Sequence, residues 1–215
     1  KGSYISFNLS NNLGDNQSDS YSIYEANFYG TTPSSINRNQ FTNNSRKTNN
    51  TSAGISYTVP LLSERKLSLT LNYNVNSNIS DNKKSTYDYD NTTQDFSSLN
   101  TDLSSDLNFS SRTNSFAANL RYRKNKWRSS FKGTFLEKAD KQDDFFRPQF
   151  SLERSFNFFN FYSSISYRIK QNTSIGLNYS KSNSSPQLSQ LISFVDISDP
   201  LNIKTGNPYL KPSAS

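Results

Sequence analysis

Hydrophobic and polar side chains alternate along residues 66–76, and this is the clearest pattern in the chain. The apolar set is Leu67, Leu69, Leu71, Tyr73 and Val75, and the polar set is Ser68, Thr70, Asn72 and Asn74. A period of two residues places these two sets on opposite faces of a β-strand. A helix would distribute the same leucines around its whole circumference. The segment is therefore predicted to be a strand with one apolar and one polar face.

The same alternation recurs along the chain, and no segment has the pattern of an amphipathic helix. We predict an all-β fold, an antiparallel meander of roughly eight strands. These lie near 3–10, 20–29, 51–59, 66–76, 103–123, 127–137, 148–169 and 173–181. In 103–123 and 148–169 the apolar positions change phase partway. Each change predicts either a β-bulge or a hidden tight turn.

The connections between these strands are short at one end and long at the other. The short ones are 60–65, 124–126 and 170–172, and the long ones are 30–50, 77–102, 138–147 and 182–208. This asymmetry is typical of a transmembrane β-barrel, whereas a soluble sandwich has no reason to sort its loops by side. We favour a barrel with lipid on the apolar face and a lumen on the polar face. The alternative is a soluble β-sandwich that binds carbohydrate.

Four aromatic residues on the apolar positions lie within a few residues of a short connection. They are Tyr57, Tyr122, Trp127 and Tyr167. Aromatic rings whose N–H or O–H group is hydrated form girdles at the membrane–water boundary, so these four are predicted interface aromatics. The alternative explanation is the high β-propensity of aromatic residues.

Five basic residues occupy polar positions of the strands near the same short connections. They are Arg121, Arg123, Arg128, Lys132 and Arg168. We predict that they face the lumen, as a positive wall that pairs with carboxylates of a plug or steers an anionic solute. The alternative is that these long side chains snorkel, with the apolar stem along the protein surface and the charged group at the membrane interface.

The composition removes several kinds of chemistry. The chain contains no Cys and no His, which excludes a thiol nucleophile, a disulfide, a Cys or His metal site and a His-based triad. We expect no enzymatic activity, no cofactor and no metal site. Asp140, Asp143 and Asp144 are interpreted as a solvated loop rather than a Ca²⁺ site. The net charge of +7 is not gathered into a basic stripe, so no nucleic-acid binding is expected.

The C-terminal stretch carries a family resemblance. Asp199-Pro200-Leu201-Asn202-Ile203 precedes Gly206-Asn207-Pro208-Tyr209-Leu210-Lys211-Pro212, and residues 57–61 are Tyr-Thr-Val-Pro-Leu. These segments resemble the outer-membrane β-barrel family of Bacteroidetes-type TonB-dependent receptors. Members of that family carry a Gly-Asn-Pro-x-Leu-Lys-Pro-Glu loop, and Ser213 stands here in place of the Glu. The two prolines fix φ, so Gly206, Asn207, Pro208, Leu210, Lys211 and Pro212 are interpreted as a rigid structural loop.

The resemblance implies a location in the bacterial outer membrane. Residues 1–215 would be one segment of a receptor-like barrel, without plug domain or signal peptide. The implied function is the wall and extracellular loops of an importer. Its partners would be the remainder of its own barrel and plug, outer-membrane lipid and a periplasmic energy-coupling protein. The alternative function is a structural or adhesive surface barrel without transport. Since open edges cannot be satisfied in lipid, we predict that the first and last strands do not close on each other. Either they pair with other polypeptide, or the chain is not folded as in the native protein.

Overall fold

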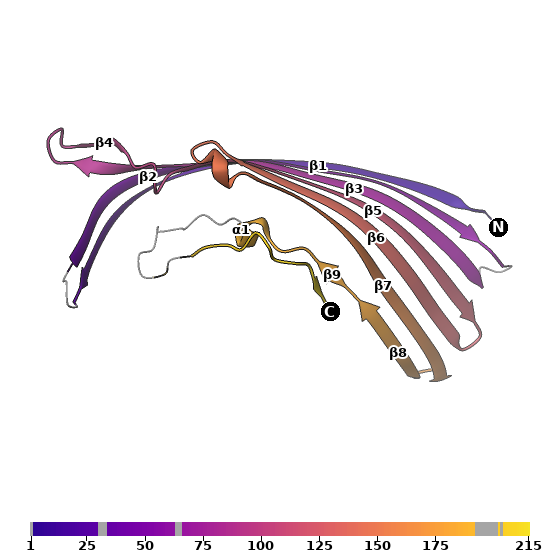
Figure 1. Ribbon diagram of the computed structural model, residues 1–215. Coiled ribbons are helices and arrows are strands. Elements are labelled where there is room, and N and C mark those ends of the chain that lie inside the picture. Colours follow the sequence, from indigo (N-terminus) through magenta and orange to yellow (C-terminus); the bar gives the residue numbers. More distant parts are fainter. Residues whose placement is uncertain (1, 30–33, 63–65, 192–201, 203) are drawn as a thin grey trace.

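The computed structural model describes residues 2–29, 34–62, 66–191, 202 and 204–215 (Figure 1). Parts of the connections predicted at 30–50, 60–65 and 182–208 therefore lie outside the described residues. The same holds for most of the segment 199–203 that resembles the family approach to the C-terminal motif.

The chain forms one curved antiparallel meander in which each long strand lies beside its sequence neighbour (Figure 1). The sheet has the order β1-β2-β3-β5-β6-β7-β8, and the short β4 pairs with β3. Its strands are β1 (Tyr4–Phe28), β2 (Ser34–Pro60), β3 (Leu67–Asp90), β4 (Asp95–Leu99), β5 (Ser105–Lys124), β6 (Trp127–Asp144), β7 (Leu152–Lys170) and β8 (Thr173–Lys181). The smaller elements are η2 (Pro148–Phe150), β9 (Asn183–Ser184), α1 (Leu188–Leu191) and β10 (Ser213–Ala214), with β10 paired to β9. The predicted all-β meander is confirmed.

The strands are longer than predicted, and much of what was predicted as loop is strand. The segments 3–10 and 20–29 belong to a single strand, β1, whose register with β2 runs without interruption from Tyr4 to Phe28. Most of 34–50, 77–90 and 138–144 likewise belongs to β2, β3 and β6. These parts are mainly polar on both faces, with scattered apolar residues such as Phe41, Ile79 and Tyr87, so no sustained alternation marks them in the sequence. Cross-strand bonds hold them instead, such as Asn43 donating to Asp19 (2.6 Å) and Thr42 beside Thr86 (3.2 Å).

The predicted sorting of connections by length is present only in part, because the β1–β2 connection at the far end, residues 29–33, is as short as the β2–β3 connection, residues 61–66. Residues 125–126 and 171–172 join strands at one end of the sheet, where the β2–β3 connection also lies. At the other end are the β4 hairpin and η2 (Figure 1). Asn125 has a φ of 51°, and Asn is among the side chains that tolerate this left-handed conformation in a tight turn.

The predicted β-bulges and hidden turns within 103–123 and 148–169 are wrong. β5 pairs with β3 without a register shift from Tyr122 to Ser105, and β7 pairs with β6 in the same way from Tyr167 to Leu152. The apolar residues change face while the ladder stays regular. In β7, Phe159 and Ile165 lie on one face, whereas Phe156 and Phe158 lie on the other.

The C-terminal segment explains why the apolar residues change face. Its described residues, 182–191 and 204–215, lie along the concave side of the sheet (Figure 1), where Lys138 donates to Ser185 (3.0 Å) and Arg154 donates to the carbonyl of Pro208 (3.2 Å). Both cations belong to the face that carries Phe156 and Phe158. This part of the concave face is therefore covered by protein, and Phe158 is only 8% exposed.

The convex face has no protein cover among the described residues. The whole described chain has only three buried hydrophobic side chains, namely Leu103, Phe158 and Leu191. In contrast, Leu71 is 45% exposed and Phe7 is 76% exposed. A sandwich requires a second sheet packed on its apolar face, and the described residues form none. The soluble β-sandwich alternative is therefore wrong.

The described strands also leave the sheet open. β1 and β8 are its two edges, and neither pairs with the other. As predicted, β1 and β8 do not close a small barrel, and their pairing with other polypeptide stays a prediction.

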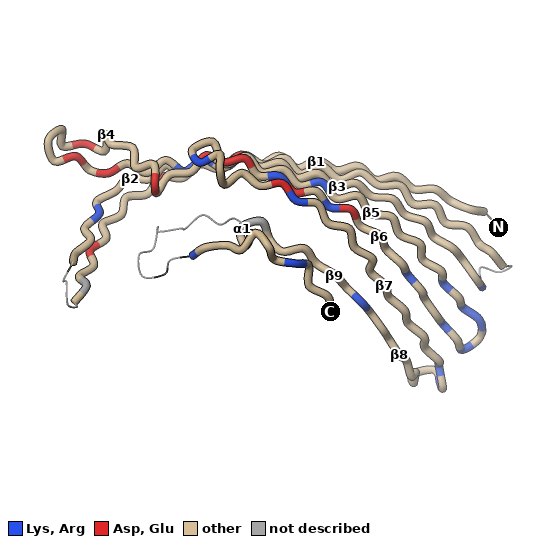
Figure 2. Tube along the Cα trace, in the orientation of Figure 1, with Lys and Arg blue, Asp and Glu red and all other residues tan. Residues whose placement is uncertain are grey.

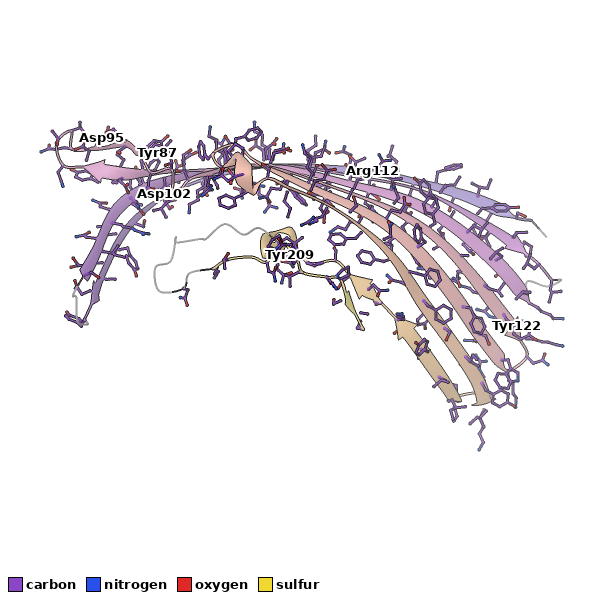
Figure 3. The ribbon with its side chains drawn as sticks, viewed as in Figure 1. Tyr87, Asp95, Asp102, Arg112, Tyr122 and Tyr209 are labelled. Carbon is purple, nitrogen blue, oxygen red and sulfur yellow. The ribbon has the colours of Figure 1, made fainter. Side chains whose placement is uncertain are left out.

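We expect Arg154→Met to loosen the C-terminal segment. The hydrogen bond from the guanidinium to the Pro208 carbonyl is charge-assisted, and its loss at a half-buried site costs about 1.5–3 kcal/mol. Hydrogen–deuterium exchange of residues 206–212 should therefore rise about tenfold or more. Arg112→Met is the control, because Arg112 lies on the convex face beside Ser77 and Ala139 (Figure 3). Equal exchange in the two variants would contradict the proposed anchor.

The turn after β3 should respond to acid. The backbone N–H of Thr92 donates to Asp90 (2.7 Å) and holds the pKa of this carboxyl below its ordinary 3.8. A lowered pKa in the folded state means that the contact stabilises the turn above pH 3.8 and is lost as the pH falls through the lowered value. A carbon-detected NMR titration should place the Asp90 midpoint below 3.8. A midpoint at or above 3.8 would exclude the contact, and Thr92→Pro, which lacks the N–H, should move it back up.

Candidate functional site: the two faces of the sheet

An apolar band crosses the convex face of seven strands near the short-turn end. The register places alternate residues of each strand side by side on this face. The band consists of the odd-numbered positions of 5–9 in β1, 53–59 in β2, 67–75 in β3, 127–135 in β6, 159–167 in β7 and 175–179 in β8, together with the even-numbered positions of 116–122 in β5. An uncovered apolar surface of this extent is not found on monomeric soluble proteins.

The width of the band matches a lipid bilayer. A stretch of nine residues such as 127–135 spans about 30 Å in a strand, and tilted transmembrane strands need about 9–11 residues. Beyond the band, β1 to β3 continue for more than ten residues that are mostly polar on both faces, with Leu13 and Ile79 among them. These parts have the composition expected in water.

The four predicted interface aromatics all lie on the convex face at the short-turn edge of the band. Trp127 faces Tyr167 across β6 and β7, with ring centroids 4.8 Å apart, and the Lys126 ammonium lies 6.0 Å from the Tyr167 centroid. Tyr57 lies opposite Leu71, and Tyr122 lies opposite Leu67. Their role as a girdle stays a prediction.

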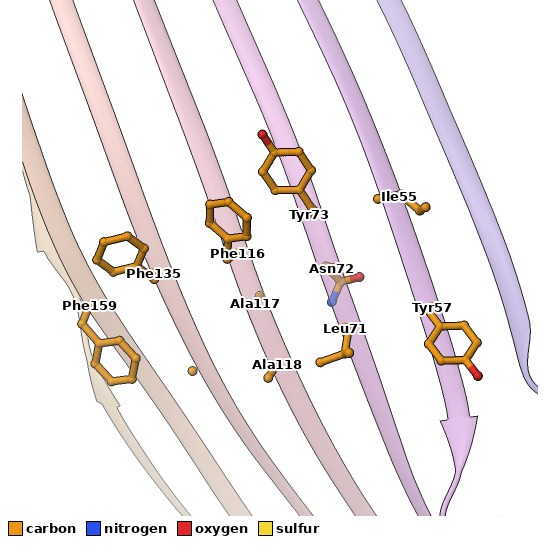
Figure 4. Close-up of a pocket in the computed structure, with 11 residues that line it drawn as sticks. Ile55, Tyr57, Leu71, Asn72, Tyr73, Phe116, Ala117, Ala118, Phe135 and Phe159 are labelled. Atoms are coloured by element: carbon orange, nitrogen blue, oxygen red, sulfur yellow. The ribbon is translucent and has the colours of Figure 1, made fainter.

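A shallow groove of about 630 Å³ lies within the band (Figure 4). Its floor is formed by Ala118 and Gly133, and aromatic rings such as Phe135 rise around it. A Cβ atom on Gly133 would lie only 3.2 Å from the ring of Phe159, so this ring is packed over the glycine. The groove is open and almost wholly apolar, which fits contact with hydrocarbon and offers no convergent polar groups for a reaction.

The concave face is polar at the height of the band. Thr58 and Thr70 share a hydrogen bond (2.9 Å), and Ser130 donates to Asn119 (3.0 Å). Hydroxyl and amide groups thus line the side of the sheet opposite the apolar band. A wall with hydrocarbon on one side and water on the other has this composition.

The structure brings the five predicted lumen-facing cations together on this concave face. Arg123 lies directly opposite Arg128, Arg121 lies opposite Ser130, and Lys132 lies opposite Asn119. Arg168 lies opposite Ser174, at the end of β7. All five are exposed, and no ion pair joins any of them to a carboxylate of the described chain.

Basic residues occur along the whole length of the sheet (Figure 2), whereas the described acidic residues lie only toward the end away from the short turns. All four ion pairs of the described residues are there as well. They are Lys83–Asp106, Lys138–Asp140, Lys141–Asp143 and Arg147–Asp144.

The interpretation of Asp140, Asp143 and Asp144 as a solvated loop is wrong. All three belong to β6, and Asp140 is only 2% exposed. Asp140 accepts from Ser111 (2.6 Å) and pairs with Lys138 (2.8 Å), while Asp144 pairs with Arg147 (3.1 Å). These carboxylates are thus engaged by protein groups, and the described residues contain no cluster of three acidic or metal-ligating side chains.

The C-terminal motif forms a compact turn against the concave face. The Asn207 N–H donates to the Gln190 carbonyl (2.7 Å), and the Tyr209 N–H donates to the Asn207 side chain (2.9 Å). Arg154 holds the turn through Pro208. Lys211 and Pro212 are exposed. The interpretation of Gly206 to Pro212 as a rigid loop stays a prediction, now with Arg154 as a named contact.

An aromatic cluster at the far end of the long strands was missed. Phe96 of the β4 hairpin lies 5.5 Å from Tyr21, 6.2 Å from Phe41 and 5.2 Å from Tyr89, measured between ring centroids. Residues 30–50 and 77–102 were predicted as loops, so nothing placed these rings side by side. The strand register would have revealed the cluster, because it sets Tyr21 opposite Phe41 and Phe41 opposite Tyr87.

Comparison with known proteins agrees with this geometry. No curated protein matches the sequence, and no helix of the described residues is long and apolar enough to cross a membrane. A family model described as "Outer membrane protein beta-barrel family" matches residues 1–215. The match covers the strands that carry the apolar band, the polar concave face and the C-terminal turn. The chain belongs to this family of outer-membrane β-barrel proteins, and its location is the bacterial outer membrane.

Proposed function

We propose that this chain forms part of the wall and the extracellular loops of an importer of the TonB-dependent receptor type. The observation that carries the proposal is the polar concave face behind an apolar band, because a wall of this kind separates lipid from an aqueous path. The resemblance of Gly206 to Pro212 and of residues 57–61 to such receptors supports the same class. We take the short-turn end to be periplasmic, as in other barrels of this membrane.

The C-terminal segment supports transport rather than a purely structural role. It lies over the concave face, held through Lys138 and Arg154, and Leu191 within it is 1% exposed. In a barrel this segment occupies part of the lumen. A segment in that position narrows the path, which suits a selective importer better than an open pore.

The importer requires more polypeptide than these strands. At the height of the band, β1 and β8 present unpaired backbone groups, each of which costs several kcal/mol in hydrocarbon. We therefore propose that both edges pair with further strands of the same barrel. A plug within that barrel and a periplasmic energy-coupling protein would be the remaining partners.

A second candidate is an adhesive surface barrel without transport. The observation that favours it is the length of β1 to β3, which together with β4 carry the Tyr21, Phe41 and Phe96 cluster far from the band. β1 has 25 residues, which corresponds to about 85 Å of strand. An exposed aromatic residue such as Tyr21 at this distance suits contact with another surface.

Import predicts a solute-specific and energy-dependent phenotype. Deletion of the gene in its host should abolish uptake of at least one nutrient too large for passive pores, measured with a panel of labelled solutes. A protonophore should abolish the same uptake in the parent strain. Re-expression of the full-length protein should restore uptake.

Two outcomes would contradict the importer. Uptake that depends on the gene but continues with the protonophore would indicate a passive pore. Unchanged uptake of every solute, together with reduced attachment of the cells to a surface, would favour the adhesive barrel.

The convex band predicts a large effect of charge at its centre. Phe131→Arg places a guanidinium midway along the band, between Leu120 and Ser163, and should destabilise the full-length protein by about 2–4 kcal/mol. Ser164→Arg is the control, since Ser164 lies at nearly the same height on the concave face, and it should change stability by less than about 1 kcal/mol. Unfolding of both variants from lipid vesicles in guanidinium measures this difference. Equal effects would mean that the convex face does not contact lipid.

A further inference from the structure

The strongest unexplained feature is the group of cations on the concave face, which we name the arginine belt. It consists of Arg121, Arg123, Arg128, Lys132 and Arg168. Arg123 and Arg128 are opposite each other on β5 and β6. The Arg168 N–H donates to the Lys126 carbonyl, which places Arg168 beside the same end of β6. Three neighbouring strands thus carry an arginine at nearly the same height.

The arrangement is unfavourable by itself. Like charges directly opposite in a sheet destabilise it, and neighbouring strands are only about 4.8 Å apart. Screening in physiological salt acts over about 8 Å and does not remove repulsion at this separation. A counterion between the guanidinium groups would replace this repulsion with a net attraction.

The described chain supplies no such counterion. At the strand positions of the concave face its acidic residues are Asp88, Asp90, Asp140 and Asp144, and each already has partners. Asp88 accepts from Gln40 (2.7 Å) and Asn100 (2.8 Å). Asp140, the nearest of them along β6, is eight residues beyond Lys132, a distance of about 27 Å in a strand.

We propose that the arginine belt binds the oxyanion group of a small solute, a carboxylate or a phosphate, at the short-turn end of the concave face. Guanidinium groups bind both groups through paired N–H donors. The hydroxyl of Ser166 lies in the same row as Arg128 and adds a neutral donor. The proposal rests on the barrel assignment and not on energised import.

Phospholipid head groups and an acidic polypeptide in the lumen are two other sources of negative charge. Phospholipid head groups would meet the rim of the barrel, where Lys124 and Lys170 lie at the turns, rather than its concave face. An acidic polypeptide within the lumen would occupy the belt permanently and leave no place for a free solute. The solute is favoured because the belt is exposed and its neighbours are small hydroxyl and amide groups.

The test is binding of pyrophosphate and citrate to the full-length protein in neutral detergent, measured by calorimetry at low and physiological salt. We expect saturable binding of at least one probe that weakens as salt rises. The double variant R123Q/R128Q should weaken it at least tenfold. The variant K124Q/K170Q removes the same number of charges from the same end of the sheet and should change the Kd less than twofold. Both variants should keep the strand signal in circular dichroism and the heat-dependent mobility of a folded barrel.

The other outcomes overturn the proposal. Absence of binding by the wild-type protein would mean that another group already fills the belt. Equal weakening in both double variants would indicate a diffuse effect of net charge. If R123Q/R128Q leaves both probes bound but lowers the affinity for nanodiscs containing phosphatidylglycerol, the belt contacts lipid head groups instead. Since none of these measurements needs an energised membrane, failure here leaves the importer proposal standing, and failure of uptake leaves the belt standing.

Discussion

The structure depends on one requirement, that every backbone N–H and C=O in hydrocarbon is bonded within the protein. The ladder from β1 to β8 meets this requirement between neighbouring strands, without any contribution from side chains. The side chains are then free to match the medium on each face. This is why Leu71 and Phe131 can stay exposed on the convex face while Asn72 and Ser130 occupy the concave face. No packed core is needed to hold the sheet.

The same independence lets the strands continue far beyond the apolar band. From Thr51 to Gln40 the ladder between β2 and β3 has no register shift, although the side chains are now polar on both faces apart from Ile79, Phe41 and Tyr87. Asparagine and threonine side chains replace hydrocarbon contact with cross-strand hydrogen bonds, as between Asn78 and Asn50 or Thr42 and Thr86. Each such bond contributes only about 1 kcal/mol, so their number matters more than any single one.

Sequence alternation reveals a strand only where the two faces meet different media. Residues 66–76 separate hydrocarbon from water, and the prediction succeeded there. Residues 77–90 meet water on both faces, so the strand left no period and was predicted as loop. In β7 the pattern misled in another way, because Phe158 is covered by the C-terminal segment, a contact between distant parts of the chain.

The concave placement of Arg123 and Arg128 followed from their odd and even positions alone. Their direct opposition follows from the two-residue turn at 125–126, whereas the burial of Asp140 required Ser111, 29 residues away.

The two ends of the concave face differ in how their charges are paired, so the electrostatic potential changes along the wall from one end to the other. At the far end Asp140 and Asp144 are neutralised by Lys138 and Arg147 within the same fold. At the short-turn end, the described chain offers the arginine belt no carboxylate. A solute with negative charge would therefore meet an increasingly positive surface as it moves toward the turns, and the field is strongest where low-dielectric walls enclose the water. The sheet provides those walls only when β1 and β8 are joined by further strands, so closure of the ladder is what makes the unpaired arginines effective.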